Sequence, residues 1–494
     1  MKNKKFDRVL VIGLDGLPLD LINKWKDQLP TIKNLMQLYG NLESVTPPLT
    51  PIAWTSFFTG VNPGKHNIYD FFKNDNYKKD IVSGRDLKAK AIWDYLTDKK
   101  LKSILVNVSY TYPIKPINGI VIAGTPASRS VKDFIYPSKM KDRILKKVPE
   151  YKMGVDWQNI NNNDDAFLKD LYKVTENQKK ASLLLMKEKW DFFMVVFEDL
   201  DRIFHFHWMY MDETHPFHNI NKEKTKKYKD SILNYLKFLD KCILEIIRKV
   251  NKKTLIILAS DHGFGPISKQ VKINNYLEKF GFLKRKNEYV KKNGRLEKII
   301  PILYKLGLYK IFKKLPERIQ KLFRNKMNSG KQQDEEVIDW GKTSAWFNSL
   351  SNPSIRINLK GREKEGIINN SRLDKLRDKI ILRLTEIRDN GKKVIKRVYK
   401  PEEIYFGEYL KNAPDLIIEM EEGYIAQRGF SENFIGDSRE GRIFKSGDHR
   451  KKGFFAIHGE GIIKEKKDMS IIDIAPTILA NFGIKNECDG KRII

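Results

Sequence analysis

Short apolar runs rich in β-branched residues recur along the chain, and helical patterns separate them. The strand-like runs cover residues 9–14, 101–108, 119–124, 190–197 and 254–260. The helical patterns cover residues 89–99, 165–189 and 222–250. A continuously apolar run is typical of a strand buried on both faces. The alternation therefore predicts an α/β fold with a mostly parallel sheet covered by helices on both faces.

Three further helices are expected near the N-terminus. Residues 19–39 show roughly helical spacing, and Pro30 should split them into two short helices. Pro51 suits the first turn of a helix that runs to Thr59, so Thr50 should lie close to its N-cap. A hydroxyl there points into the positive end of a helix, where an anion is favoured. The simpler alternative is that Thr50 only caps the helix.

The α/β pattern resumes in the last third of the chain. Strands are expected at 354–359, 393–398, 415–419 and 453–458, with helices at 371–388 and 473–480. His449 should lie on a Gly-rich loop before the last of these strands. The pattern predicts one three-layer α/β/α sandwich built from residues 1–280 and 346–494, with residues 281–345 as an insertion.

The insertion is strongly basic. Residues 284–331 carry sixteen lysines and arginines against three glutamates, a net charge of +13, with leucines and phenylalanines at roughly helical spacing. Such a basic amphipathic segment forms either a lid packed over the core or a helix on a membrane surface. We favour the lid, because an apolar stripe usually packs against its own protein.

Composition limits the classes of protein. The net charge of +31 reflects either a solvated lysine-rich surface or attraction to a polyanion. Cys242 and Cys488 lie far apart, which excludes a disulfide framework and favours a reducing compartment. No apolar run approaches the roughly 18 residues of a membrane-spanning helix, and no cleavable hydrophobic segment precedes the first strand. The sequence therefore predicts a soluble, cytoplasmic protein.

Acidic and histidine residues follow three of the predicted strands. Asp15, the pair Asp201 and His205, and the pair Asp261 and His262 each come after one, and His449 lies on its loop. Ligands of α/β sheets bind at the carboxyl ends of the strands. Asp201 and His205 are four residues apart and share one face of a helix. Asp and His are the ligands that zinc and manganese accept, so the pattern indicates a metal site.

Six motifs carry a resemblance to a known family. They are Gly-Leu-Asp-Gly at 13–16, Thr-Pro-x-x-Trp-Thr-Ser-Phe-Phe-Thr-Gly at 50–60, Asp-x-x-x-His at 201–205, Ser-Asp-His-Gly at 260–263, Gly-x-His-Arg at 447–450 and Asp-Ile-Ala-Pro-Thr at 473–477. With them the chain resembles the alkaline phosphatase superfamily, and within it the type I phosphodiesterase / nucleotide pyrophosphatase group. No motif covers residues 284–331.

The resemblance implies a site with two divalent metal ions, usually zinc and in some members manganese. It assigns one metal to Asp15, Thr50, Asp261 and His262, and the other to Asp201, His205 and His449. It also implies that Thr50 is the nucleophile and passes through a phosphothreonine intermediate. Two cations a few ångström apart suit in-line displacement at phosphorus.

One part of the family pattern is missing. The nucleotide pyrophosphatase branch has an asparagine that contacts the phosphate shortly after this threonine-glycine loop, and here that position is Phe71. Lys65 and Asn107 are the candidates to take its place as substrate-binding residues.

The sequence thus predicts a metal-dependent phosphoryl hydrolase, specifically a phosphodiesterase or nucleotide pyrophosphatase with an anionic phosphate-ester substrate. A phosphomonoesterase and a phosphoryl or headgroup transferase are the alternatives within the superfamily. A sulfatase would need Cys or Ser in place of Thr50. The alternative from another class is a basic nucleic-acid- or membrane-binding protein with a vestigial fold, and seven intact ligand positions argue against it. We expect no stable nucleic-acid complex, whereas peripheral contact with an anionic membrane stays an open alternative.

Overall fold

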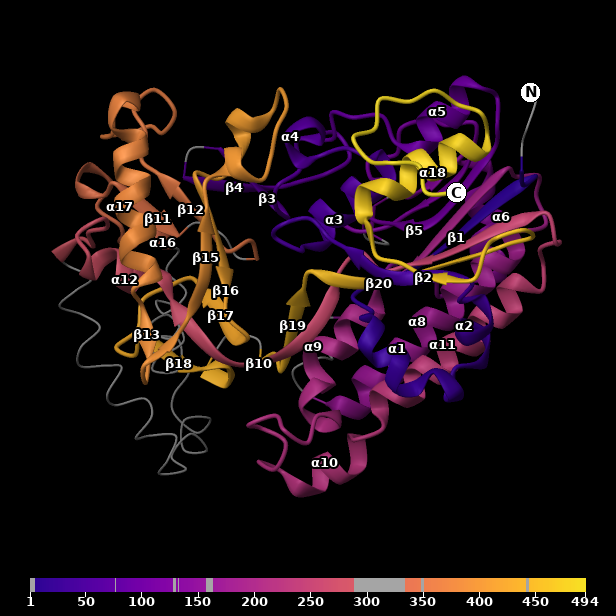
Figure 1. Cartoon of the computed structure of the whole chain (residues 1–494), viewed down its shortest axis with the longest axis horizontal. Helices are drawn as coiled ribbons and strands as arrows, with labels where there is room; N and C mark the ends of the chain where they lie inside the picture. Colours follow the sequence, from indigo (N-terminus) through magenta and orange to yellow (C-terminus); the bar gives the residue numbers. More distant parts are fainter. Residues whose placement is uncertain are drawn as a thin grey trace, which may run out of the picture.

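A ten-stranded sheet organises the larger part of the molecule (Figure 1). The computed structural model describes residues 5–75, 77–127, 130–131, 133–156, 163–287, 334–347, 351–440 and 444–494. The strand order is β21-β2-β20-β9-β1-β8-β5-β6-β7, and β22 pairs with β2. The strands are β1 Arg8–Leu14, β2 Leu38–Glu43, β5 Ser103–Val108, β6 Gly119–Ala123, β7 Ile135–Tyr136, β8 Phe192–Phe197, β9 Thr254–Ala259, β20 Lys452–His458, β21 Glu465–Lys466 and β22 Met469–Ser470.

The middle of this sheet is parallel. Strand β1 pairs in parallel with β8 on one side and β9 on the other, and β5 and β6 continue the same direction. Antiparallel neighbours appear only toward the edges, where β20 pairs with β9 and β2, and β7 pairs with β6. The prediction of a mostly parallel central sheet is confirmed.

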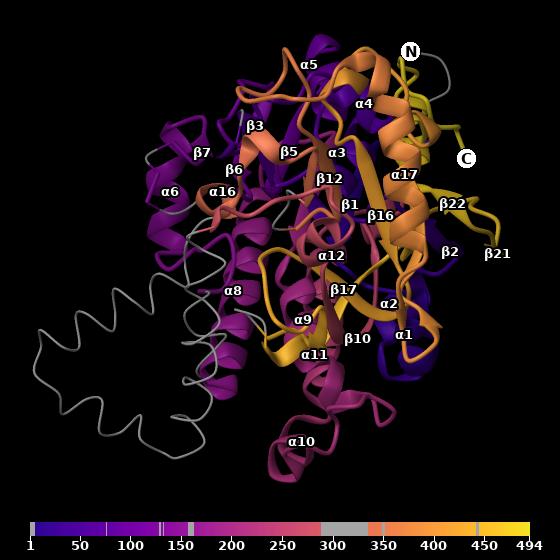
Figure 2. The ribbon, with the colours of Figure 1, turned by 90° about the vertical axis from the view of Figure 1, so that its left-hand side faces the viewer.

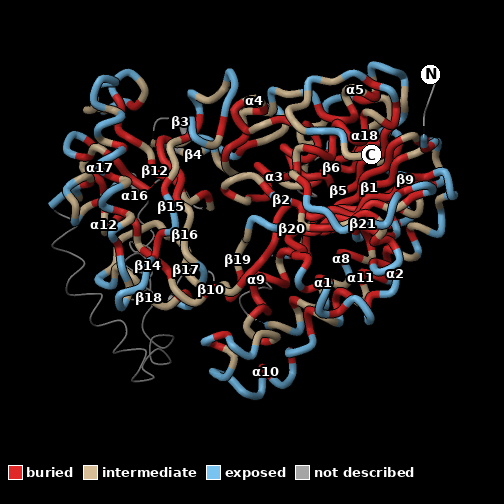
Figure 3. The backbone as a smooth tube through the Cα atoms, viewed as in Figure 1, coloured by how far each residue is buried: buried red, intermediate tan, exposed pale blue. Residues whose placement is uncertain are grey.

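Successive side chains of β1 serve two separate cores. Leu10 and Ile12 pack against the helices on one face, and Val9 and Val11 pack against those on the other. Because both faces are covered, residues 9–14 of this strand are apolar without alternation and buried (Figure 3). One helical layer contains α1 Leu19–Trp25, α2 Pro30–Leu35, α6 Lys139–Lys147, α8 Asp164–Leu185, α9 Asp199–Met211 and α11 Ser231–Ile247, and the other contains α3 Thr50–Thr59, α5 Ile92–Asp98 and α18 Ile474–Asn481. The predicted three-layer α/β/α sandwich is confirmed.

A second unit with its own core lies beside the sandwich. Its antiparallel sheet has the order β11-β12-β16-β15, with α17 along one side of it (Figure 2). The elements are α12 Ile273–Lys279, β11 Ala345–Phe347, β12 Ser354–Ile357, α17 Leu373–Thr385, β15 Ile395–Tyr399 and β16 Leu416–Met420. Strand β10, Gly263–Lys272, connects the two units and pairs with β17 Gly423–Gln427, β18 Ile435–Asp437 and β19 Gly447–Arg450.

This arrangement changes the picture of the last third of the chain. The strands expected at 354–359, 393–398 and 415–419 exist, but they form the separate antiparallel sheet and do not extend the central one. Of the strands described after residue 334, only β20, β21 and β22 return to the central sheet. Most of the basic segment 284–331 lies outside the described residues, so its role as a lid or membrane-surface helix stays a prediction, as does the division of the chain at residues 281 and 345.

Three local expectations were wrong. Residues 38 and 39, the end of the segment 19–39 expected to be helical, belong to β2. In this strand buried Leu38, Gly40 and Leu42 alternate with more exposed residues, and the strand pairs with β20. The helix expected at 222–250 is two helices, α10 Lys222–Tyr228 and α11, because Asp230 leaves the helical conformation. His449 lies in strand β19, not in a loop, because residues 447–450 pair with the start of β10.

None of the helices in the described ranges combines the length and the apolar character needed to span a membrane.

Gly13 generates a stability prediction. A Cβ atom at this position would come within 2.6 Å of the Trp54 ring and 2.9 Å of Val196. Both neighbours are fully buried, so neither side chain can move aside. We expect Gly13→Ala to lower the free energy of unfolding by about 1–3 kcal/mol, the usual cost of overpacking. Chemical denaturation measures it.

Gly341→Ala is the matched control, because the nearest heavy atom to its added Cβ lies at 3.7 Å. This control should stay within about 0.5 kcal/mol of the wild-type protein. Equal stability of both variants would contradict the packing argument.

Candidate active site

Three neighbouring parallel strands bring the acidic residues to one edge of the sheet. Asp15 directly follows β1, and Asp261 and His262 directly follow β9. Helix α9 begins two residues after the end of β8 and carries Asp201 in its first turn and His205 one turn later. This is the edge at which open α/β sheets bind their ligands.

The remaining two residues come from elsewhere in the chain. Thr50 is the first residue of α3, with Leu49 as its N-cap, so its position is one residue further into the helix than the sequence suggested. His449 reaches the site because it pairs with Phe264 in the antiparallel ladder of β19 and β10. All seven residues named from the sequence therefore lie at one place, and six of them are buried while His449 is partly exposed.

The first group contains Asp15, Asp261, His262 and Thr50. The Nε2 atom of His262 lies 3.5 Å from Asp15 Oδ1, 3.3 Å from Asp261 Oδ2 and 3.4 Å from Thr50 Oγ1. Trp54 donates from Nε1 to Asp15 Oδ2 at 2.9 Å, and the backbone N–H of Gly16 donates to Asp261 Oδ1 at 3.2 Å. In each carboxylate one oxygen accepts a hydrogen bond that orients the group, and the other oxygen faces His262.

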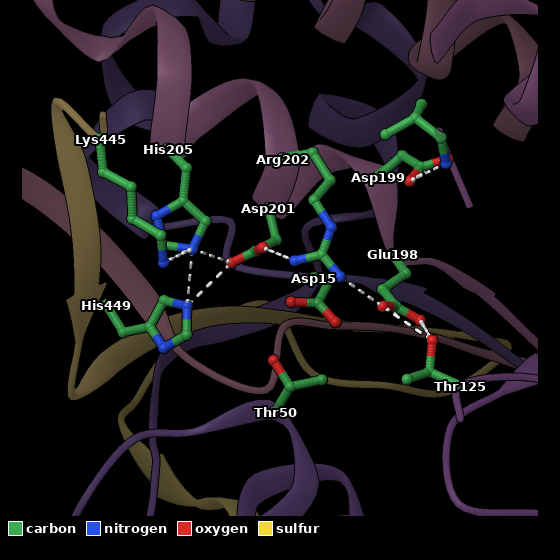
Figure 4. Close-up of polar contacts among 12 residues, drawn as sticks. Asp15, Thr50, Thr125, Glu198, Asp199, Asp201, Arg202, His205, Lys445 and His449 are labelled. Atoms are coloured by element: carbon green, nitrogen blue, oxygen red, sulfur yellow. Dashed lines mark hydrogen bonds and ion pairs between the residues drawn. The ribbon is translucent and has the colours of Figure 1, made fainter. Parts of the chain in front are cut away.

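The second group contains Asp201, His205 and His449 (Figure 4). Asp201 Oδ1 lies 2.9 Å from His449 Nε2 and 3.4 Å from His205 Nε2, and the two Nε2 atoms are 3.2 Å apart. His205 donates from Nδ1 to the carbonyl of Gly447 at 2.8 Å, which leaves a lone pair on Nε2. The imidazole rings of His262 and His449 stack at 3.9 Å, so the two groups adjoin.

This donor set fits divalent cations. Asp15 Oδ1 and Asp261 Oδ2 are buried and have no hydrogen-bond partner. Ligand atoms of Asp15, Asp261 and His262 lie within 4.8 Å of one another, as do those of Asp201, His262 and His449. Buried carboxylates without a partner are costly unless a cation compensates them. Carboxylate and imidazole ligands of this kind suit zinc and manganese.

The pKa values agree with a cation site. Burial, followed by repulsion from Asp261 and Asp201, raises the pKa of Asp15 well above its ordinary value. Burial likewise raises the pKa of Asp261 and lowers that of His205 to about 3. The histidine is therefore neutral near pH 7, which is the form that binds a metal. Burial alone would also raise the pKa of Asp201, but His205, His449 and an arginine hold this pKa well below its ordinary value.

That arginine, Arg202, was missed in the sequence. It donates from Nη1 to Asp201 Oδ2 at 2.7 Å and from Nη2 to Glu198 Oε1 at 2.8 Å. Thr125 in turn donates to Glu198 at 2.8 Å (Figure 4). Arg202 thus occupies one oxygen of Asp201 and leaves the other to face the histidines. The only signal in the sequence was the run of charges Glu198-Asp-Leu-Asp-Arg202 directly after a buried strand.

Lys65 and Asn107 make other contacts. The ammonium of Lys65, in α4 Pro63–His66, pairs with Asp489 near the end of the chain. Asn107 donates from Nδ2 to the carbonyl of Val196 at 3.1 Å and so joins β5 to β8. Among the described residues, neither side chain forms a hydrogen bond or ion pair with the two groups. Their role in substrate binding stays a prediction.

Arg202 generates a prediction about metal affinity. Outer partners of metal ligands typically contribute 10- to 100-fold to affinity. We expect Arg202→Gln to weaken metal binding at the Asp201 group by about 10- to 100-fold, because Asp201 loses the partner that orients it. Competition with a chelator measures this affinity.

Arg383→Gln is the control, since Arg383 is 56% exposed on α17. It should bind metal as the wild-type protein does. Unchanged affinity in Arg202→Gln would show that the other contacts of Asp201 suffice to orient it.

Comparisons with known proteins agree with this geometry. The sequence model of the type I phosphodiesterase / nucleotide pyrophosphatase family matches residues 9–454. No curated protein matches the chain. Among solved structures, human ectonucleotide pyrophosphatase / phosphodiesterase 5 is similar over 98% of this chain and 97% of its own, with 15% identity and a TM-score of 0.53. The murine protein has 13% identity over 97% and 96% of the two chains, with a TM-score of 0.53.

An inactive variant of the murine protein in complex with AMP has 14% identity over 97% and 96% of the two chains, with a TM-score of 0.50. At these identities the solved structures speak for the fold alone, whereas the family model covers most of the sequence. The chain therefore belongs to the type I phosphodiesterase / nucleotide pyrophosphatase family, whose members are metal-dependent hydrolases of phosphodiester and pyrophosphate bonds.

Proposed function

We propose that this protein hydrolyses phosphodiester or pyrophosphate bonds with Thr50 as its nucleophile and two divalent metal ions, zinc or manganese, as cofactors. The observation that carries the proposal is the position of the Thr50 hydroxyl. It lies at the first residue of α3, 3.4 Å from His262 Nε2, in the group that contains the unpartnered oxygens Asp15 Oδ1 and Asp261 Oδ2. Family membership supports the reaction class.

Each metal would have its own ligands. Asp15, Asp261 and His262, together with Thr50, would hold one metal, and Asp201, His205 and His449 would hold the other. Bound there, two divalent cations would lower the pKa of the Thr50 hydroxyl and neutralise charge on the oxygens of the phosphoryl group. Arg202 and Trp54 would keep Asp201 and Asp15 in orientation.

Thr50 would then act in two steps. Its hydroxyl gives its proton to solvent, and Oγ1 forms a bond to phosphorus while the leaving oxygen departs with the electron pair of the broken bond, which produces phosphothreonine. A water molecule next attacks the same phosphorus, and the bond to Oγ1 breaks and restores the hydroxyl. The positive end of α3 favours the anionic phosphoryl group throughout.

Thr50 argues against a sulfatase, which would need Cys or Ser at this position. The intact arrangement of all seven side chains argues against a vestigial fold that only binds nucleic acid or membranes. The cytoplasmic location predicted from the sequence stays a prediction.

Removal of metal is the first test. We expect a chelator to abolish hydrolysis of bis-p-nitrophenyl phosphate, because three buried carboxylates then repel one another and the hydroxyl of Thr50 keeps its ordinary pKa. Zinc or manganese should restore the activity, and the metal content of the restored protein should be two ions per chain. Full activity in a metal-free sample would overturn the proposal.

Replacement of Thr50 is the second test. Thr50→Ala should reduce kcat by ~10³-fold or more, since loss of a nucleophile has effects of this size in other hydrolases. Thr50→Ser should keep measurable activity, because it retains the hydroxyl. Thr214→Ala, on an exposed turn, is the control and should match the wild-type protein. If Thr50→Ala keeps near wild-type kcat, a water or another residue attacks phosphorus.

A further inference from the structure

A lysine reaches the candidate site and has no role in the reaction described above. Lys445 Nζ lies 3.2 Å from His205 Nε2, and Figure 4 shows its side chain directed at the second group. The backbone beside it is fixed, because Ser446 N–H donates to the carbonyl of His205 at 2.7 Å. The side chain is 29% exposed, so the ammonium stands between the site and solvent.

We propose that Lys445 binds a phosphate of the leaving group, and that it thereby selects substrates in which a second phosphate adjoins the bond that breaks. This inference rests on the proposed function and deepens it. It assigns pyrophosphate-containing compounds, such as nucleoside triphosphates, as the preferred substrate class over simple diesters.

The first argument concerns the acceptor of the ammonium. The lone pair of His205 Nε2 is the atom that the proposed function gives to a metal. A lysine ammonium has three donors and no acceptor, and a nearby divalent cation repels it. Once the second group holds its metal, the ammonium of Lys445 would lose His205 as acceptor and could donate to a further anion. Asp448 Oδ1, at 3.9 Å, keeps the ammonium on this side of the site without closing a hydrogen bond.

The second argument concerns the direction of the reaction. Thr50 belongs to the first group, in which its hydroxyl contacts His262, so the attack on phosphorus comes from that side. In an in-line displacement the leaving oxygen departs on the opposite side. That side is the second group, and Lys445 contacts His205 within it. The ammonium therefore meets the leaving group and not the nucleophile.

The third argument concerns charge. A leaving alcohol presents one oxygen at the second group. A leaving phosphate presents additional anionic oxygens beside the one that departs, and these can accept from an ammonium. Arg202 is engaged with Asp201 and Glu198, so it is not placed to take this part. Lys445 contacts His205 in the second group, so its ammonium lies on the side from which the leaving group departs.

A pair of ligands isolates the contact. AMP has one phosphate, whereas α,β-methylene-ADP has a second one beyond a bond that cannot be hydrolysed. We expect metal-loaded wild-type protein to bind α,β-methylene-ADP at least 10-fold more tightly than AMP in calorimetry. Lys445→Met should bind the two ligands with similar affinity, and Lys445→Arg should keep a large part of the preference for α,β-methylene-ADP. Metal content is measured in each sample.

A pair of substrates provides a kinetic readout. Thymidine triphosphate and thymidine 5′-p-nitrophenyl phosphate donate the same thymidylyl group, but only the first has a phosphate in its leaving group. Lys445→Met should reduce kcat/KM for the triphosphate at least 10-fold more than for the nitrophenyl ester. Lys451→Met is the control for net charge, since Lys451 pairs with Glu43 and is 45% exposed.

The outcomes separate the two proposals. Hydrolysis of the nitrophenyl ester by wild-type protein tests the proposed function alone. Equal affinity of wild-type protein for AMP and α,β-methylene-ADP would overturn the role of Lys445. A Lys445→Met variant that still binds α,β-methylene-ADP at least 10-fold more tightly than AMP would also overturn it. The same holds for a variant whose only change is tighter metal binding, because the ammonium would then merely compete with the metal for His205.

Discussion

Repulsion between buried carboxylates is the constraint on which the site depends. Asp15, Asp201 and Asp261 are each at most 1% exposed and lie together at one edge of the sheet. Each is held by a specific donor: Trp54, Arg202 or the backbone of Gly16. These donors satisfy one oxygen of each carboxylate and leave the others directed inward. The fold fixes the geometry, and a cation must supply the compensating charge.

Close packing beneath the site helps to hold one of these carboxylates. Gly13 has no side chain, so the indole of Trp54 can lie against β1 and reach Asp15. The packing of the core therefore sets the orientation of Asp15, a proposed metal ligand, and a single added methyl group would disturb both the packing and this carboxylate.

The sequence allowed the central strands and the site to be predicted, for a clear physical reason. Strands buried on both faces are continuously apolar, and the acidic residues stand where such runs end. Strand β2 escaped prediction because its alternation is short and follows a helical pattern. The separate sheet of β12, β15 and β16 also escaped, because antiparallel pairing between distant segments leaves no local signal. The contact of Lys445 with His205 joins distant parts of the chain and arises only from tertiary structure. Arg202 contacts Asp201 and Glu198 within one helical turn, but the residue types alone did not show that it orients Asp201.

The place of β20 in the sheet has a consequence for synthesis of the chain. This strand, residues 452–458, lies between β2 and β9, which are made long before it. Until it leaves the ribosome, β2 and β9 each lack their shared neighbour and present an unpaired edge. His449 emerges just ahead of the same strand. A nascent chain therefore acquires its last proposed metal ligand and the strand that joins β2 to β9 at almost the same moment.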